Sequence, residues 1–181
     1  MSNTERKYQI INSESVFNGK MFNINRDKVK LPTGQEQTRE TLLHPGAVVI
    51  LPKLEDSRLV LIKQYRHSVK KEIIEFPAGT LEKSEEITSC ALRELREETG
   101  YGAKQIVSIG SYYPAPGFCN EIQHFFYADG LYQDKLESDE DEIIEVVYYS
   151  VEEFESLIRA NEVIDSKSVA IYFKAKMLGH V

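Results

Sequence analysis

Between Gly79 and Tyr101, four of the six carboxylates and one of the two arginines have a spacing that suits binding of a divalent cation. The segment reads GTLEKSEEITSCALRELREETGY, and its carboxylates in this pattern are Glu85, Glu94, Glu97 and Glu98. Carboxylate oxygens are the donors that hard cations such as Mg²⁺ prefer. The chemistry to expect is therefore cation-assisted attack on an anionic substrate.

A helix over residues 85–99 would bring two of these carboxylates onto one face. Ser84 is a suitable N-cap, and Gly100 suits the position just after the last turn. With 3.6 residues per turn, Glu94 and Glu98 lie on the same side. Because like charges four residues apart repel each other, this spacing favours a cation between them.

The alternative is an ordinary solvated helix whose charged residues all face water. Against this interpretation, a step of about 100° per residue places Glu94 and Glu98 in line with apolar Ile87 and Ala91, whereas Arg96 points the opposite way. Carboxylates on an inward-facing stripe need partners, because unpaired buried charge is costly. We therefore favour the metal-binding interpretation.

Two neighbouring groups are expected to support this face. Arg93 projects in a different direction from Glu94 and is expected to pair with Glu85 or Glu97, which would orient these carboxylates. The turn Pro77-Ala78-Gly79 brings the backbone close to the helix, because glycine permits conformations that other residues avoid. A carbonyl oxygen of this turn would complete the oxygen shell of a cation.

Composition limits the classes of function. The chain has 181 residues, of which 41% are hydrophobic and 28% charged, as expected of a globular protein with one main domain. A net charge of −7 without a basic stripe argues against binding to nucleic acid or an anionic membrane surface. The N-terminus lacks a signal-peptide pattern and no apolar run is long enough to span a membrane, so a cytoplasmic location is expected.

The rest of the chain is expected to alternate strands and helices. The capping box of Ser150 and Glu153 predicts a helix over 151–160, and a last helix is expected over 165–178. Apolar and β-branched segments predict strands at 47–52, 59–65, 73–76, 105–112, 123–128 and 143–149.

The first part of the chain has a different character. Short alternating segments are broken by Asn18-Gly19 and by Pro32-Thr33-Gly34, which predicts hairpins. We therefore predict an N-terminal β unit over 1–43 and a main domain over 44–181. The fold class is α+β, with a mixed β-sheet flanked by helices as an α/β/α sandwich.

The spacing from Gly79 to Tyr101 matches the signature of the Nudix hydrolases, and the chain resembles this family over nearly all its length. It is most similar to the branch that acts on ADP-ribose and related nucleoside diphosphate sugars. Pro116, sixteen residues beyond Gly100, has the spacing associated with that branch. The other matching segments are HPGAVVILP at 44–52, QYRHSV at 64–69, EFPAGTLE at 75–82 and YPAPGFCNE at 113–121.

The resemblance implies that water attacks a phosphorus of the diphosphate and releases a nucleoside monophosphate and a sugar phosphate. It also implies Mg²⁺ as cofactor, with Mn²⁺ as the alternative. The matching metal ligands are the Ala78 carbonyl and the carboxylates of Glu94, Glu97 and Glu98, while Glu85 and Arg93 match the residues that support them.

In similar enzymes the base that takes the proton of water lies on an acidic loop outside the signature. Here that loop is LESDEDEIIEV at 136–146, and the alignment of its second half favours Glu142, with Glu140 next. The alternative for either residue is an ordinary solvated acidic loop.

The resemblance also implies residues that bind the substrate. Arg66 matches an arginine that binds the diphosphate or nucleotide portion, Arg39 is expected to do likewise, and Glu121 matches a residue near the terminal ribose. Phe22 is a candidate for stacking on a base, although an aromatic residue in a strand is more often part of a core. The chain has no tryptophan, which some members use to sandwich adenine, so GDP-mannose remains an alternative substrate.

The resemblance further implies a homodimer, because the N-terminal β unit is commonly exchanged between subunits in this family. Two other functions stay open. One is a sensor that binds a nucleotide sugar without hydrolysis, for which eroded acidic positions would be expected. The other is a diphosphatase that removes damaged nucleoside triphosphates, which Pro116 and the N-terminal unit disfavour.

Overall fold

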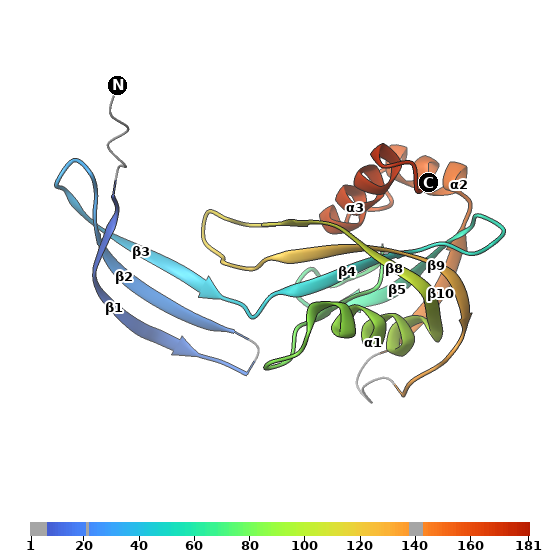
Figure 1. Ribbon diagram of the computed structural model, residues 1–181. Helices are drawn as coiled ribbons and strands as arrows, with labels where there is room; N and C mark the ends of the chain where they lie inside the picture. The colour runs from blue at the N-terminus through green and yellow to red at the C-terminus, as the bar shows by residue number, and fades with distance from the viewer. Residues whose placement is uncertain (1–6, 21, 138–142) are drawn as a thin grey trace, which may run out of the picture. The chain divides into compact units, whose positions relative to one another are not determined.

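The computed structural model describes residues 7–20, 22–137 and 143–181. These residues form ten strands and three helices (Figure 1). The chain divides into two compact units, and each is described by itself. One unit contains the N-terminal residues up to His44 together with Ala115–Glu121, and the other contains Pro45–Pro114 and Ile122–Val181.

The N-terminal unit is a three-stranded antiparallel sheet in the order β1-β2-β3. Both expected hairpin turns are found between its strands, whose bounds are β1 Gln9–Asn18, β2 Asn23–Lys30 and β3 Glu36–Leu43. The segment Ala115–Glu121 belongs to this unit, where the backbone of Cys119 forms an isolated parallel β-bridge with Leu42. The predicted boundary at residue 43 did not include this segment.

The second unit contains two sheets, in the orders β7-β4-β9-β8 and β10-β5-β6. Strands β4 and β9 are parallel and the other pairs are antiparallel, so the expected mixed sheet is present. The strand bounds are β4 Ala47–Pro52, β5 Leu59–Arg66, β6 Lys71–Glu75, β7 Ala78–Thr80, β8 Tyr101–Tyr112, β9 Gln123–Gln133 and β10 Ile144–Tyr149.

Helix α1 lies on one side of these sheets and helices α2 and α3 lie on the other (Figure 1). Alternate residues of β4 explain this arrangement, because successive side chains of a strand point to opposite faces. Val48 and Ile50 pack in the cluster that contains α1, whereas Val49 and Leu51 pack in the cluster that contains α2 and α3. The helix bounds are α1 Ile87–Thr99, α2 Val151–Arg159 and α3 Ser166–Met177.

The helix ends agree with the sequence predictions except at the start of α1. Gly100 ends α1 with a positive φ of 76°, and Ser150 and Glu153 form the expected capping box of α2. The N-cap of α1, however, is Glu86 rather than Ser84, because the Glu86 side chain accepts a hydrogen bond from the Ser89 amide. The helix therefore begins two residues later than predicted.

Among the described residues, no helix is both long enough and apolar enough to cross a membrane.

Candidate active site

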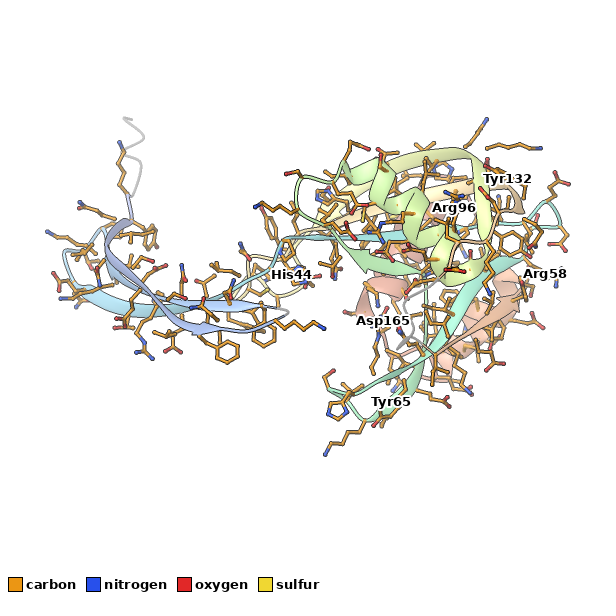
Figure 2. All side chains as sticks on the ribbon, turned by 90° about the horizontal axis from the view of Figure 1, so that it is seen from below. His44, Arg58, Tyr65, Arg96, Tyr132 and Asp165 are labelled. Atoms are coloured by element: carbon orange, nitrogen blue, oxygen red, sulfur yellow. The ribbon has the colours of Figure 1, made fainter. Side chains whose placement is uncertain are left out.

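Two carboxylates of helix α1 point toward the protein interior, as the sequence predicted. Glu94 is only 9% exposed and Glu98 only 5%, and they share a face with the buried Ala91. By contrast Arg96, labelled in Figure 2, pairs at the helix surface with Asp134 at 2.9 Å. A solvated charged helix would not bury its carboxylates in this way, so the alternative interpretation, a helix whose charged residues all face water, is wrong.

The Glu98 carboxylate contacts the segment Pro77-Ala78-Gly79, called the β7 turn below, whose last two residues belong to strand β7. The backbone N–H of Ala78 donates a hydrogen bond of 2.8 Å to Oε2 of Glu98. The same turn is fixed to the central strand, because the Pro77 carbonyl accepts a hydrogen bond of 2.9 Å from the Ile50 amide. Helix α1 and strand β4 therefore both hold the backbone at Ala78.

The Glu94 carboxylate lies directly against Gly79. A Cβ atom placed on Gly79 would be 1.8 Å from the carboxyl carbon of Glu94 and 2.0 and 2.3 Å from its two oxygens. Carbon atoms do not approach so closely, so a side chain at residue 79 and this position of Glu94 exclude each other. Glycine is required here for space, whereas an unusual backbone conformation was expected from the sequence; Gly79 does not have a positive φ.

Arg93 joins the other carboxylates of the signature. Its guanidinium group donates hydrogen bonds of 2.8 and 3.0 Å to Glu85, one of 2.7 Å to Glu94 and one of 2.7 Å to Glu97. The expected pairing with Glu85 or Glu97 is thus present for both residues. The hydrogen bond from Arg93 is the main cause that lowers the pKa of Glu85 to about 2, so Glu85 stays ionised at neutral pH.

The donors around α1 suit a hard divalent cation. They are carboxylate oxygens, and the glutamates at 94 and 98 are nearly buried beside backbone of the β7 turn. In the described part of the chain, no group of three or more His, Cys, Asp or Glu side chains is arranged to hold a metal ion. In this arrangement Arg93 holds one oxygen of Glu94 and one of Glu97.

Arg66 lies at the end of β5 and contacts a fully buried carboxylate. Its Nε donates a hydrogen bond of 2.7 Å to Oε1 of Glu75, which is 0% exposed, while the Arg66 side chain is 37% exposed. Burial disfavours the charged guanidinium, but the Glu75 hydrogen bond and the nearby charges of Glu75, Glu98 and Asp165 outweigh it and raise the pKa of Arg66. The charge of Arg66 therefore lies within electrostatic reach of the Glu98 carboxylate of α1.

Residues of the N-terminal turn of α3 complete the surroundings of Arg66 and Glu75. Asp165, the N-cap of α3, accepts hydrogen bonds from the amide and the hydroxyl of Ser168 at 2.9 and 2.6 Å. The Ser168 hydroxyl in turn accepts a hydrogen bond of 2.8 Å from the Phe76 amide. Lys167 pairs with Glu75 and, at 3.1 Å, with Asp165.

These contacts were not anticipated from the sequence. Glu75 stands in the segment EFPAGTLE, and Asp165 stands at the start of the expected last helix, but neither position was assigned to the site. A charged residue one step before Phe76 and a lysine in a first helical turn are common on protein surfaces. Only the fold shows that residues 75 and 167, far apart in the chain, meet in a buried ion pair.

The predicted site residues divide between the two units. The metal-ligand and supporting candidates, with Arg66, belong to the unit that contains α1. Arg39, Phe22 and Glu121 belong to the N-terminal unit, where Arg39 hydrogen-bonds Gln37, Phe22 packs its ring 5.8 Å from that of Phe17, and the Glu121 amide contacts Cys119 Sγ. Their roles in substrate binding stay predictions.

The two candidates for the base, Glu140 and Glu142, lie outside the described residues.

The fold and the helix with its buried carboxylates define a class, that of α+β hydrolases built on one glutamate-rich helix. A family model described as the NUDIX domain matches residues 42–170, and the chain belongs to the Nudix family. The family and fold class expected from the sequence are thereby confirmed.

Individual relatives agree with this placement. The chain is 42% identical over 160 residues to an ADP-ribose pyrophosphatase of Bacillus subtilis, which covers 87% of this chain and 86% of the relative. It is 38% identical over 161 residues to a methanol dehydrogenase activator of Bacillus methanolicus, covering 88% of this chain and 87% of the relative. A crystal structure of an ADP compounds hydrolase superimposes with a TM-score of 0.87 at 26% identity, covering 99% of this chain and all of that one.

Proposed function

We propose that this protein is a divalent-cation-dependent diphosphatase for ADP-ribose or a related nucleoside diphosphate sugar. Water attacks one phosphorus, a new P–O bond forms, and the bridging P–O bond breaks to leave a nucleoside monophosphate and a sugar phosphate. The observation that carries the proposal is the buried pair Glu94 and Glu98 against the Gly79 turn, in a Nudix chain 42% identical to an ADP-ribose pyrophosphatase.

We assign the roles of the residues from the Nudix pattern, and the contacts around helix α1 support this assignment. Glu94, Glu97, Glu98 and the Ala78 carbonyl would hold Mg²⁺, with Mn²⁺ as its substitute. When bound, the cation would neutralise the diphosphate and lower the pKa of bound water. Arg93 fixes the carboxylates that surround it through the four hydrogen bonds described above.

The remaining roles concern the substrate and the proton. Arg66 is charged and partly exposed, which suits binding of a diphosphate by a guanidinium group. The acidic segment 136–146 would supply the base, with Glu142 as the first candidate and Glu140 as the second. Arg39, Glu121 and Phe22 would contribute to the nucleotide and ribose subsites.

A substrate panel tests this function directly. We expect the purified protein with Mg²⁺ to release AMP and ribose 5-phosphate from ADP-ribose, measured by chromatography, and to lose this activity when the cation is chelated. GDP-mannose, other diphosphate sugars and nucleoside triphosphates form the comparison set. A clear preference for triphosphates would identify a triphosphate-sanitising enzyme instead, and release of no product from any nucleotide would contradict hydrolysis.

A regulatory function is the second candidate, because one relative carries the name of a methanol dehydrogenase activator. A sensor without hydrolysis would bind a nucleotide sugar and form no product. The acidic positions of the signature are all present in this chain, which favours hydrolysis. Calorimetry in parallel with the substrate panel separates the two functions.

We also propose that the protein is a homodimer formed through the N-terminal unit. Among the described residues of strands β1 to β3, none is buried, and a small sheet without a core is marginally stable by itself. Its exposed apolar side chains form the kind of surface that a second copy covers. They include Tyr8, Ile10, Ile11, Val16, Phe17 and Phe22.

The dimer predicts the mass of two chains in light scattering, and a double substitution Ile10→Lys and Phe17→Lys is expected to give the mass of one chain. Arg58→Glu, at an exposed position of the other unit, serves as the control for an added charge change. A single-chain mass for the unaltered protein at micromolar concentration would contradict the proposal.

A further inference from the structure

A buried group of charges connects the substrate arginine to the last helix. Glu75 at the end of β6 is fully buried, and its two oxygens are shared between two cations: Oε1 accepts from Nε of Arg66 at 2.7 Å, and Oε2 pairs with Lys167 of α3. Figure 2 labels Tyr65, next to Arg66 at the end of β5, and Asp165, the N-cap of α3, which mark the two elements that supply these cations.

Because the two oxygens of Glu75 have different partners, Arg66 contacts only one of them. Arg66 contacts Glu75 through Nε, and its terminal nitrogens Nη1 and Nη2 donate no hydrogen bond to any other described residue. A guanidinium group next to a carboxylate normally prefers the bidentate arrangement, in which two of its nitrogens face both oxygens. Here Lys167 occupies the second oxygen, so this arrangement is not formed.

Lys167 itself is held firmly in this position. Its side chain is mostly buried and contacts Asp165 at 3.1 Å as well as Glu75. Asp165 is fixed by two hydrogen bonds from Ser168. The Ser168 hydroxyl also accepts a hydrogen bond of 2.8 Å from the Phe76 amide. The lysine therefore cannot move away from Glu75 without breaking contacts of the helix N-terminus.

We propose that Lys167 is a positioning residue for substrate binding, because it occupies one oxygen of Glu75 and so keeps both terminal nitrogens of Arg66 available for the diphosphate. Without Lys167, the second oxygen of Glu75 would be buried and unpaired, which is costly. Arg66 is the other cation in contact with Glu75, and it would turn to bind both oxygens. One of its terminal nitrogens would then be lost to the substrate.

The inference rests on the proposed function, and it predicts a specific kinetic pattern for Lys167→Met. We expect KM for ADP-ribose to rise about tenfold, the scale of one charge-assisted hydrogen bond, while kcat changes less than about threefold. Lys167→Arg keeps a cation beside Glu75 and is expected to restore most of the affinity. Lys174→Met is the matched control on the same helix, because Lys174 forms no ion pair with another described residue.

A double-mutant cycle separates positioning from a general structural role. If Lys167 acts through Arg66, then Lys167→Met will change KM by less than about twofold in an Arg66→Met background, since the affected donor is already absent. A rise in KM of similar size in both backgrounds would overturn the proposal. A fall in kcat with unchanged KM, or a loss of thermal stability without any change in KM, would overturn it as well.

Failure of the proposed function gives a different result. If the unaltered protein releases no product from ADP-ribose, the diphosphatase assignment fails, and the same four proteins of the cycle are then compared by their calorimetric dissociation constants for ADP with Mg²⁺. Weaker binding by Lys167→Met only where Arg66 is present supports the positioning role. Equal binding by all four proteins overturns it.

Discussion

Replacing Glu98 with glutamine is expected to lower kcat by at least about a hundredfold, the scale of losing a group that acts in the transition state. The amide has the shape of the carboxylate, and its oxygen can still accept the hydrogen bond that the Ala78 amide donates to Oε2 at 2.8 Å. The substitution therefore removes the negative charge while preserving the contact between α1 and the β7 turn. Steady-state kinetics with ADP-ribose and Mg²⁺ measures the loss.

Binding and stability measurements show whether the charge is the cause. We expect Glu98→Gln to bind Mg²⁺ more weakly in calorimetry, since a neutral amide is a poorer partner for a hard cation. The thermal midpoint should not fall, because removing one of the buried like charges on α1 relieves repulsion. Glu55→Gln, on an exposed turn, is the matched control. A kcat within about twofold of the unaltered protein would exclude Glu98 from the catalytic cation site.

The inward-facing carboxylates of helix α1 were predictable, because the same short segment of sequence contains both the carboxylates and the apolar residues that decide which face is buried. The periodicity that aligns Glu94 and Glu98 with Ala91 also decides which residues α1 buries, so the inward carboxylates followed from spacing alone. The predicted N-cap, Ser84, was wrong, because the side chain of Glu86 can also accept a hydrogen bond from an amide of the first turn. In the structure Ser84 has a positive φ of 67°, whereas Glu86 has the extended backbone of an N-cap and caps the helix.

The surroundings of Arg66 were not predictable, because they depend on contacts between distant parts of the chain. Glu75 and Lys167 are 92 residues apart, and neither the pattern of β6 nor that of α3 indicates that their charges meet. A single sequence records which residues are apolar and how they repeat. It does not record which element ends lie side by side, and buried ion pairs of this kind form at such ends.

The second large effect is expected for Gly79→Ala, a change of one methyl group. Gly79 does not have a positive φ, so alanine fits the backbone conformation at this position. The new Cβ, however, would lie 1.8 Å from the carboxyl carbon of Glu94, and one of the two must move. Glu94 is the end of a flexible side chain, whereas the turn is fixed by the hydrogen bonds of Pro77 and Ala78.

We therefore expect the methyl group to displace the Glu94 carboxylate and to lower kcat by at least about a hundredfold, as for loss of a catalytic group. Overpacking of this kind costs about 1–3 kcal/mol, so the protein should remain folded. Gly117→Ala is the matched control, because a Cβ there meets no atom within 4 Å and its φ is not positive. If Gly79→Ala keeps full activity, Glu94 functions equally well in another position, and the close fit between helix α1 and the turn is not required for catalysis.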